Sequence, residues 1–361
     1  MANFGSSGHF VWRKAPDDRP SLKSGVSHDY ICPACRAPLA RYDESFVCAA
    51  CGHEFPILFG IADLRLRSDK YLTLEQERDK ARRLYEYGLE HSFDELVAFY
   101  YSITDDVPAD LAKRYGAYVR AGVSRGERVL RSLSDGSVQG DVLDVGCASG
   151  GLLVAGALAG HRCVGVDIAL RWLVICACQL REMGVKAELV CADVEALPFA
   201  DETFDVVVAT DLLENVYDIE NALEAMAAAL HPAGLLWLSG TNKFCVGPHP
   251  LVGIWAIGYL PGRLRRWLVT ARHGIDSLRH VQLISPGGIA LACRRVGLEV
   301  CQVAPQAVSV AGYQHVTSLA RTAVRLYSAL RTVPVVRTAM VLLGPVFEMT
   351  CVKPANLAGG R

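Results

Sequence analysis

The ten-residue segment 142–151, VLDVGCASGG, constrains this chain more than any other part of its sequence. Its first four residues predict a buried strand, and the small residues that follow predict a tight turn into a helix. Small residues in such a turn let a ligand approach the backbone and the helix N-terminus. By itself the pattern Gly146-x-Ala148-x-Gly150 identifies no ligand, because any tight strand-to-helix turn favours small residues.

Two further segments follow this turn at spacings typical of a nucleotide-binding sheet. The run VGVDI, residues 164–168, contains Asp167 directly after its apolar residues. A carboxylate at the end of such a strand can accept hydrogen bonds from both hydroxyls of a ribose. The run VCADVEALPF places Asp193 after another apolar stretch. Alternating strands and helices predict a parallel sheet with helices on both faces. We expect strands near 141–145, 163–167, 187–191, 204–209, 234–239, 298–304 and 347–352, and helices over 151–159, 170–183 and 219–230.

Five motifs in this order resemble those of class I S-adenosylmethionine-dependent methyltransferases. Residues 203–216 resemble the fourth strand and the loop that closes on the cofactor, and residues 230–238 resemble the turn into the fifth strand. Ala148 stands where that family usually has glycine. The resemblance implies an α/β fold with a doubly wound, seven-stranded Rossmann-like sheet and an antiparallel last strand. A doubly wound domain for NAD is the alternative.

The same resemblance implies a set of residues that bind S-adenosylmethionine. In it, Asp167 holds the ribose and Asp193 holds the adenine amino group. The full set is Asp144, Gly146, Cys147, Ala148, Gly150, Asp167, Ile168, Asp193, Val194 and Asp211.

Two Cys-x-x-Cys pairs near the N-terminus predict a metal site. Cys32 and Cys35 form the first pair, and Cys48 and Cys51 form the second after twelve intervening residues. Four thiolates at about 2.3 Å suit a structural, tetrahedral zinc ion. His53 is an alternative ligand, and a redox dithiol is the alternative interpretation of either pair. The segment resembles the zinc ribbons found before some methyltransferase domains. About forty residues are too few for a self-sufficient core, so zinc would supply folding free energy.

The chain divides into four expected parts. Residues 1–27 are an expected disordered tail, 28–66 a zinc ribbon, and 67–138 a helical linker with a cofactor-covering helix. Residues 139–361 are the expected methyltransferase domain, with helical cap insertions at 241–285 and 308–344. Helical periodicity covers 73–89 and 109–133. By resemblance, Arg114, Tyr115 and Tyr118 are candidates to contact the methionine carboxylate, and a packed helix with a solvated arginine is the alternative.

The charge and composition of the chain limit which ligands and partners we expect it to bind. The formal net charge is −1, which gives no global basic field for nucleic acid. The insertions combine aromatic residues with arginines, which suits an amphipathic ligand, an anionic group or a membrane surface. A helical cap with solvated arginines is the alternative. The polar N-terminal thirty residues lack a secretory signal pattern, so we expect a cytoplasmic protein. The oligomeric state stays open.

Methyl transfer requires a nucleophile in line with the sulfonium methyl, and a base only if the nucleophile must lose a proton. Asp211, Glu214 and Asn215 follow the fourth strand, and Asn215 replaces a histidine that many related small-molecule enzymes have. His249, between two prolines, is the candidate base, with a structural histidine as the alternative. We expect methylation of a small or lipid-linked metabolite, at oxygen. An RNA base methyltransferase and a non-catalytic cofactor-binding subunit are the alternatives.

Overall fold

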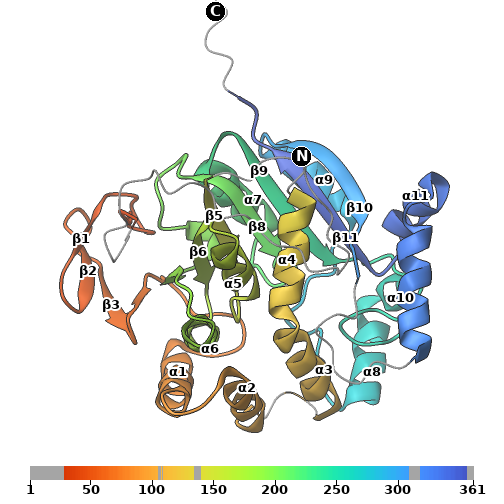
Figure 1. The fold of residues 1–361 in the computed structure, drawn as a ribbon, viewed down its shortest axis with the longest axis horizontal. Coiled ribbons are helices and arrows are strands. Elements are labelled where there is room, and N and C mark those ends of the chain that lie inside the picture. The colour runs from red at the N-terminus through yellow and green to blue at the C-terminus, as the bar shows by residue number, and fades with distance from the viewer. Residues whose placement is uncertain (1–27, 105–106, 108, 134–139, 309–317, 356–361) are drawn as a thin grey trace, which may run out of the picture.

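The computed structural model describes residues 28–104, 107, 109–133, 140–308 and 318–355. The predicted tail, residues 1–27, lies outside the described residues, as do residues 309–317 of the second insertion. One mixed sheet runs through the described part of the molecule in the order β1-β2-β3-β4-β7-β6-β5-β8-β9-β11-β10 (Figure 1).

The predicted doubly wound sheet is confirmed. Strands β7, β6, β5, β8 and β9 are parallel, and β11 lies antiparallel between β9 and β10. The central parallel strands β5, β6 and β8 are apolar and largely buried on both faces, as parallel sheets require. Their bounds are β5 (Asp141–Val145), β6 (Arg162–Asp167), β7 (Glu188–Cys191), β8 (Phe204–Thr210), β9 (Leu230–Thr241), β10 (Glu299–Pro305) and β11 (Val346–Val352).

The expected count of seven strands omits the contribution of the ribbon. The strand β4 pairs in parallel with β7 through Ala62–Val190 and Asp63–Cys191, so the ribbon extends the central sheet. Tyr30 lies 6.0 Å from Phe199, ring centre to ring centre, and joins the main core. The four added strands are β1 (Leu39–Arg41), β2 (Ser45–Cys48), β3 (Glu54–Leu58) and β4 (Ile61–Asp63).

Helices cover both faces of the sheet and create two hydrophobic cores. One core joins the ribbon to α7 (Ile219–Ala229) and α9 (Pro286–Arg295). The other lies beneath the helices that precede and follow β5. Its helices are α1 (Leu74–Gly88), α2 (Phe93–Ser102), α4 (Gly122–Leu133), α5 (Gly151–Leu158) and α6 (Leu170–Glu182).

The helical linker differs from its predicted form in two places. Helix α2, which begins with a capping box at Ser92, was not expected from the sequence. The expected helix over 109–133 is two helices, α3 (Ala109–Arg120) and α4, separated at Ala121. Helix α4 packs directly on the backbone of α5: a Cβ atom placed on Gly126 would lie 2.7 Å from the carbonyl oxygen of Gly151. This close packing brings the linker to the turn after β5.

The two insertions form the predicted helical cap. The first contains a short turn, η2 (Ile257–Tyr259), and α8 (Gly262–His273), with a small core of its own around Val252 and Val269. The second contains α10 (Ser318–Leu330) and α11 (Pro334–Leu343). Within the described residues, no single helix has the length and hydropathy needed to cross a membrane. The segments Val324–Leu330 and Pro334–Leu343 have that length and hydropathy only when taken together, and they are bent by 117° relative to each other.

Candidate functional site

The turn after β5 is a tight cradle made of backbone groups. Gly146 has a φ of +74° and donates its N–H to the carbonyl oxygen of Val166 at 2.7 Å, and Cys147 donates to the same oxygen at 3.0 Å. Ala148 has a φ of +44°, in the left-handed region that costs energy for any residue with a Cβ atom. This conformation explains why glycine suits the position, and the alanine here keeps the turn at some cost in strain.

Glycine is required at the end of this turn. Gly150 has a φ of +82°, and a Cβ atom there would lie 2.3 Å from the Sγ of Cys176. Helix α5 begins at the next residue, so its first N–H groups have no intrahelical acceptor. Such a helix N-terminus suits an anionic group of a ligand, such as a carboxylate.

Two aspartates lie beneath the cradle, Asp144 buried and Asp167 partly buried. Asp167 accepts hydrogen bonds from the N–H groups of Ala148 at 2.9 Å and Ala169 at 2.8 Å. Burial raises the pKa of Asp167 to about 6, although these two hydrogen bonds oppose the shift. Asp144 is 3% exposed, and burial, with the charge of Asp167, raises its pKa to about 8. Burial therefore disfavours the ionised form of both carboxyl groups.

The third predicted acidic residue, Asp193, lies past the end of β7. It caps the short helix η1 (Val194–Ala196) by accepting from the N–H of Glu195 at 3.0 Å. Its other carboxylate oxygen accepts from Arg67 at 2.5 Å. Arg67 comes from the linker, and nothing in the sequence pattern pointed to it.

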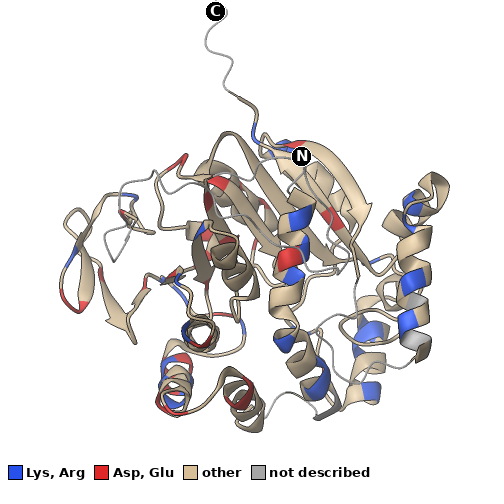
Figure 2. Cartoon of the chain, in the orientation of Figure 1, with Lys and Arg blue, Asp and Glu red and all other residues tan. Residues whose placement is uncertain are grey.

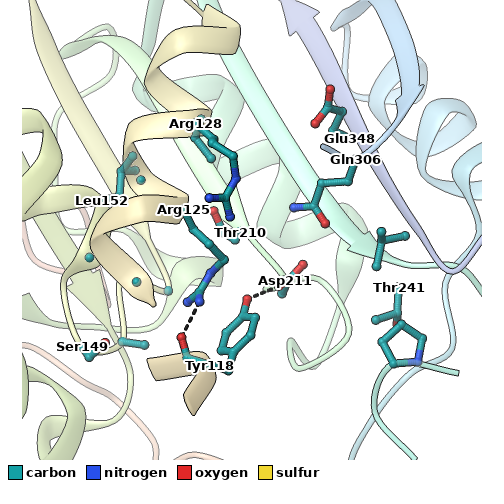
Figure 3. Close-up of a pocket in the computed structure, with 18 of the residues that line it drawn as sticks. Tyr118, Arg125, Arg128, Ser149, Leu152, Thr210, Asp211, Thr241, Gln306 and Glu348 are labelled. Carbon is teal, nitrogen blue, oxygen red and sulfur yellow. Dashed lines mark hydrogen bonds between the residues drawn. The ribbon is translucent and has the colours of Figure 1, made fainter. Parts of the chain in front are cut away.

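A cavity of about 660 Å³ opens beside the cradle, between α3 and α4 on one side and the ends of β8, β9 and β11 on the other (Figure 3). Five of the predicted cofactor residues line it: Asp144, Gly146, Cys147, Ala148 and Asp211. The other five do not line this cavity: Gly150, Asp167, Ile168, Asp193 and Val194. The cofactor assignment of these ten residues therefore stays a prediction, which the proximity of Asp167 to Ala148 supports.

The helical wall of the cavity is basic and aromatic. Arg114 lines it and donates to the carbonyl oxygen of Pro250 at 3.0 Å, and Tyr115 and Tyr118 line it too, while their contact with a methionine carboxylate stays a prediction. Arg125 and Arg128 also line it, and the sequence analysis missed them. The guanidinium of Arg125 lies 3.4 Å from the centre of the Tyr118 ring.

A sequence signal for the missed arginines does exist. Arg114, Tyr118, Arg125 and Arg128 are separated by four, seven and three residues, which places them on one side of a helical path. The break between α3 and α4 leaves this stripe intact, and Figure 3 shows Tyr118, Arg125 and Arg128 together at the cavity.

The opposite wall carries acidic groups after β8. Asp211 has a φ of +52°, accepts from the hydroxyl of Ser239 at 3.0 Å and accepts a hydrogen bond from the hydroxyl of Tyr118. Glu214 is 2% exposed and accepts from the N–H and the hydroxyl of Thr241. Burial, with the charge of Asp211, raises the pKa of Glu214 to about 7. The loop thus places a carboxyl group that is about half ionised near pH 7 in the cavity wall.

The candidate base His249 lies apart from this wall. It is 1% exposed and does not line the cavity, although its neighbours Pro250 and Leu251 do. Burial, with the charge of Arg265, lowers its pKa to about 4. Its catalytic role stays a prediction, and its packing favours the structural alternative.

The four ribbon cysteines come together. All four Sγ atoms of Cys32, Cys35, Cys48 and Cys51 lie within 4.8 Å of one another. The Cys32–Cys51 and Cys35–Cys48 distances are 3.6 and 3.5 Å. Four sulfurs bound at about 2.3 Å to a tetrahedral zinc ion would lie about 3.8 Å apart, so the donor set fits that ion. His53 lies beside it, with Nδ1 3.3 Å from the Sγ of Cys51.

Comparisons with known proteins address the central part of the chain. Residues 143–238 match the family described as a methyltransferase domain. A ubiquinone biosynthesis O-methyltransferase of Bordetella avium is 34% identical over 166 residues, which cover 45% of this chain and 64% of that relative. One from Idiomarina loihiensis is 35% identical over 117 residues, covering 32% and 47%. The chain thus spans less than two thirds of the length of these relatives.

A solved structure resembles the fold more distantly. It is an S-adenosylmethionine-dependent methyltransferase from Mesorhizobium loti, 16% identical, with a TM-score of 0.42. The match covers 62% of this chain and 96% of that one.

Proposed function

We propose, from the premise that residues 143–238 belong to the methyltransferase domain family, that this chain transfers a methyl group from S-adenosylmethionine to a hydroxyl oxygen. The acceptor that we propose is a small or lipid-linked metabolite. The observation that carries the proposal is the cavity beside the cradle, which joins the turn after β5 to a buried carboxyl group. The names of the relatives from Bordetella avium and Idiomarina loihiensis support oxygen as the methylated atom.

The residues present fit S-adenosylmethionine. The cradle excludes side chains at Gly150, and the helix N-terminus behind it favours a carboxylate. We propose that Asp167 binds the ribose hydroxyls and that Asp193 accepts a hydrogen bond from the adenine amino group. Arg114, Arg125 and Arg128 supply positive charge for the methionine carboxylate. When bound, the cofactor supplies a methyl group activated by a positive sulfur.

Glu214 is the base that we propose for the acceptor hydroxyl. Its Oε2 atom is buried and has no hydrogen-bond partner among the described residues, while Oε1 is held by Thr241. Oε2 would take the hydroxyl proton as the oxygen lone pair forms the new bond to the methyl carbon. The electrons of the broken carbon–sulfur bond stay on sulfur. A base with a pKa near the working pH is efficient in this role, and the pKa of Glu214 of about 7 meets that need.

The cap supports an acceptor presented at a membrane surface. Residues 241–285 and 308–344 hold ten Lys and Arg residues and one acidic residue, Asp276, in a chain whose net charge is −1. In Figure 2, α8, α10 and α11 carry basic but no acidic residues. Large apolar side chains are exposed on the same cap, among them Trp255 at 71% and Trp267 at 65%.

Two hydrogen bonds join pairs of these exposed apolar residues in the cap. Tyr259 donates to the carbonyl oxygen of Phe244 at 2.8 Å, and Val246 donates its N–H to Leu343 at 3.2 Å. Aromatic and basic groups together favour the interface of an anionic bilayer. We therefore propose that the cap binds anionic lipid at the cytoplasmic side of a membrane, where reducing conditions keep the ribbon thiols available for zinc.

The two alternatives receive less support. RNA binding predicts a basic surface that joins the ribbon to the cavity. Residues 28–66 instead hold three basic residues, Arg36, Arg41 and Arg65, and five acidic ones, Asp29, Asp43, Glu44, Glu54 and Asp63. A non-catalytic subunit predicts a site closed to an acceptor, whereas the cavity extends from the cradle to β11.

The experiment that tests the proposal supplies the full-length protein with methyl-labelled S-adenosylmethionine and a prenylated phenol in anionic vesicles. The matched control is the same phenol with its hydroxyl already methylated. We expect label in the free phenol and none in the control. Binding of S-adenosylhomocysteine without label transfer to any phenol would overturn the proposed activity.

A further inference from the structure

The segment that follows β4, residues 65–71, lies across the ends of three sheet strands, and we call it the strap. Its first residue, Arg65, is 7% exposed and bonds both carboxylate oxygens of Asp63, at 2.7 and 2.9 Å. Arg65 also donates to the carbonyl oxygen of Ile168 at 2.9 Å, directly after the predicted ribose ligand. The strap is thereby joined to the edge of the predicted cofactor site.

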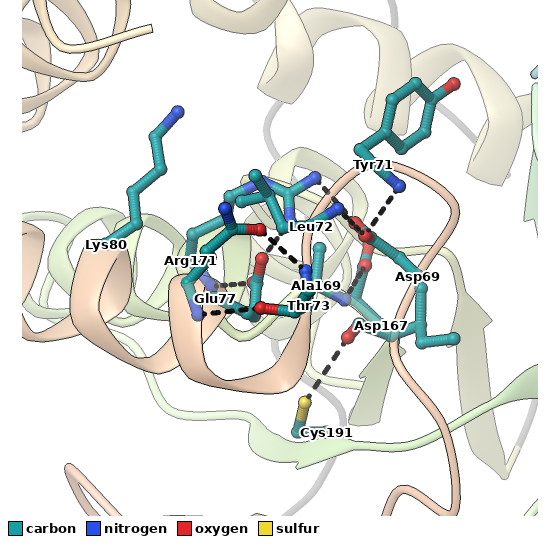
Figure 4. Close-up of polar contacts among 12 residues, drawn as sticks. Asp69, Tyr71, Leu72, Thr73, Glu77, Lys80, Asp167, Ala169, Arg171 and Cys191 are labelled. Carbon is teal, nitrogen blue, oxygen red and sulfur yellow. Dashed lines mark hydrogen bonds and ion pairs between the residues drawn. The ribbon is translucent and has the colours of Figure 1, made fainter.

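The far end of the strap is fixed as firmly as the near end. Asp69 pairs with Arg171 of α6 at 2.8 Å, both side chains being buried, and Glu77 of α1 bonds the same arginine (Figure 4). Lys70 donates to the carbonyl oxygen of Val216, in the loop after β8, at 2.7 Å. The strap therefore has little freedom on either side of the residue between these anchors.

That residue is Arg67, and its guanidinium connects three groups. Nε donates to Oδ2 of Asp193 at 2.5 Å, and Nη2 lies 2.8 Å from a carboxylate oxygen of Glu195. The guanidinium also lies 4.1 Å from the centre of the Tyr217 ring. An isolated, partly exposed ion pair contributes little to stability. Here the planar guanidinium contacts two carboxylates and an aromatic ring near the end of β7. Such a group fixes the orientation of the carboxylates that it contacts.

We infer that Arg67 is a positioning residue for the cofactor, because it fixes the Asp193 carboxylate in the orientation that accepts the 6-amino group of adenine. This inference rests on the proposed function. One oxygen of Asp193 accepts a hydrogen bond from the backbone N–H of Glu195, and the other accepts one from the Arg67 guanidinium. These two bonds fix the plane of the carboxylate. Each oxygen keeps a further lone pair for a ligand. Arg67 also compensates the charge of a carboxylate that is nearly buried.

The consequence is discrimination between purine bases. A site that holds a buried acceptor in place rejects a ligand that cannot donate to it. Hypoxanthine carries an oxygen where adenine carries the amino group, so S-inosylhomocysteine would face the Asp193 carboxylate with an acceptor. The structure thus assigns adenine selectivity to a residue of the strap, outside the methyltransferase motifs.

The test measures binding of S-adenosylhomocysteine and S-inosylhomocysteine by calorimetry to the full-length protein and to Arg67→Ala. We expect Arg67→Ala to weaken adenosyl binding roughly tenfold, and to reduce the adenosyl-to-inosyl affinity ratio by a similar factor, because a charge-assisted contact is lost. Arg67→Lys should restore only part of the ratio, since lysine lacks the planar fork. The control is Arg82→Ala, which removes an exposed pair on α1 with Asp79.

A second measurement keeps the result interpretable if Arg67→Ala unfolds. In an Asp193→Ala background, Arg67→Lys should change neither affinity, because the two residues act as one unit. An unchanged affinity ratio in both Arg67 variants, with normal zinc content, would overturn the inference while leaving the proposed function intact. Failure of the unmodified protein to bind S-adenosylhomocysteine would overturn both. A ratio that falls equally in Arg82→Ala would also reject the role of Arg67.

Discussion

The carboxylate of Glu214 accepts hydrogen bonds from the N–H of Thr241 at 2.6 Å and from its hydroxyl at 3.1 Å, both through Oε1. This one-sided arrangement leaves Oε2 buried and without a partner among the described residues, on a residue that lines the cavity. A base must be ionised to take a proton, and burial raises the pKa of Glu214 to about 7.

The first prediction concerns the pH profile. We expect kcat/KM for methyl transfer to rise with pH through a midpoint near 7 and to level off above it. Glu214→Gln should lower kcat/KM at pH 8 by on the order of 100-fold and abolish the rise. Initial rates from pH 5 to 9 check this, with the exposed Glu220→Gln as control. A Glu214→Gln enzyme that keeps the wild-type profile would show that the proton goes elsewhere.

The second prediction concerns the ribose. Asp167→Ala should weaken S-adenosylhomocysteine binding by more than about tenfold, because two charge-assisted hydrogen bonds are lost. Calorimetry measures the affinity, and the matched control is Asp201→Ala, an exposed carboxylate that pairs with Arg36. Equal affinity in the two variants would remove Asp167 from the cofactor site.

The third prediction concerns stability without cofactor. Burial raises the pKa of Asp144 to about 8, whereas an unfolded aspartate titrates near pH ~3.9. Its favourable contribution is thus complete below about pH 4 and is lost as pH rises toward 8. Asp144→Asn should therefore increase the free energy of unfolding more at pH 8 than at pH 5. Urea titrations at both pH values measure this; a gain independent of pH would contradict the assigned titration.

The fourth prediction concerns zinc. Because β4 pairs with β7, and Tyr30 packs in the main core, loss of the metal should destabilise more than the ribbon. We expect one equivalent of zinc per chain, and Cys32→Ser should lower the Tm of the whole cooperative transition. Cys301→Ser, an exposed cysteine on β10, is the control. A Tm unchanged by Cys32→Ser would separate the ribbon energetically from the sheet.

The fifth prediction concerns the cap. Trp267→Ala should reduce binding to vesicles that contain phosphatidylglycerol several-fold, since a large exposed apolar side chain is lost. Binding should also weaken with salt and be lower on pure phosphatidylcholine. Co-sedimentation measures it, with Tyr42→Ala on the ribbon, 58% exposed, as control. Equal loss in both variants, or binding indifferent to lipid charge, would count against a specific cap surface.

The strands and helices of the central sheet could be predicted because local signals agree with the fold there. The run before Gly146 has the apolar residues Val142, Leu143 and Val145 of a buried strand, and the glycine positions require a turn at that point. The four cysteines likewise combine two strong local motifs, and the structure places their sulfur atoms together. In both cases the determining residues are neighbours in sequence.

The remaining features depend on contacts between distant segments. Nothing near Ala62 predicts its pairing with Val190, 128 residues later. The contact of Arg67 with Asp193 spans 126 residues, and its signal is one arginine in a charged stretch. His249 shows the opposite difficulty: its flanking prolines fix its backbone, but its side chain is buried and does not line the cavity. Local pattern does not determine which way a loop residue points.

The pairing of β4 with β7 has a further consequence for how this protein keeps itself from associating. Without that pairing, β7 would end the sheet with a row of free N–H and C=O groups, which is a template for aggregation. The ribbon covers this edge and leaves the short β1 as the terminal strand. A fragment that starts after the linker would therefore expose β7 as an unpaired edge strand, and we expect it to aggregate more readily than the full-length protein.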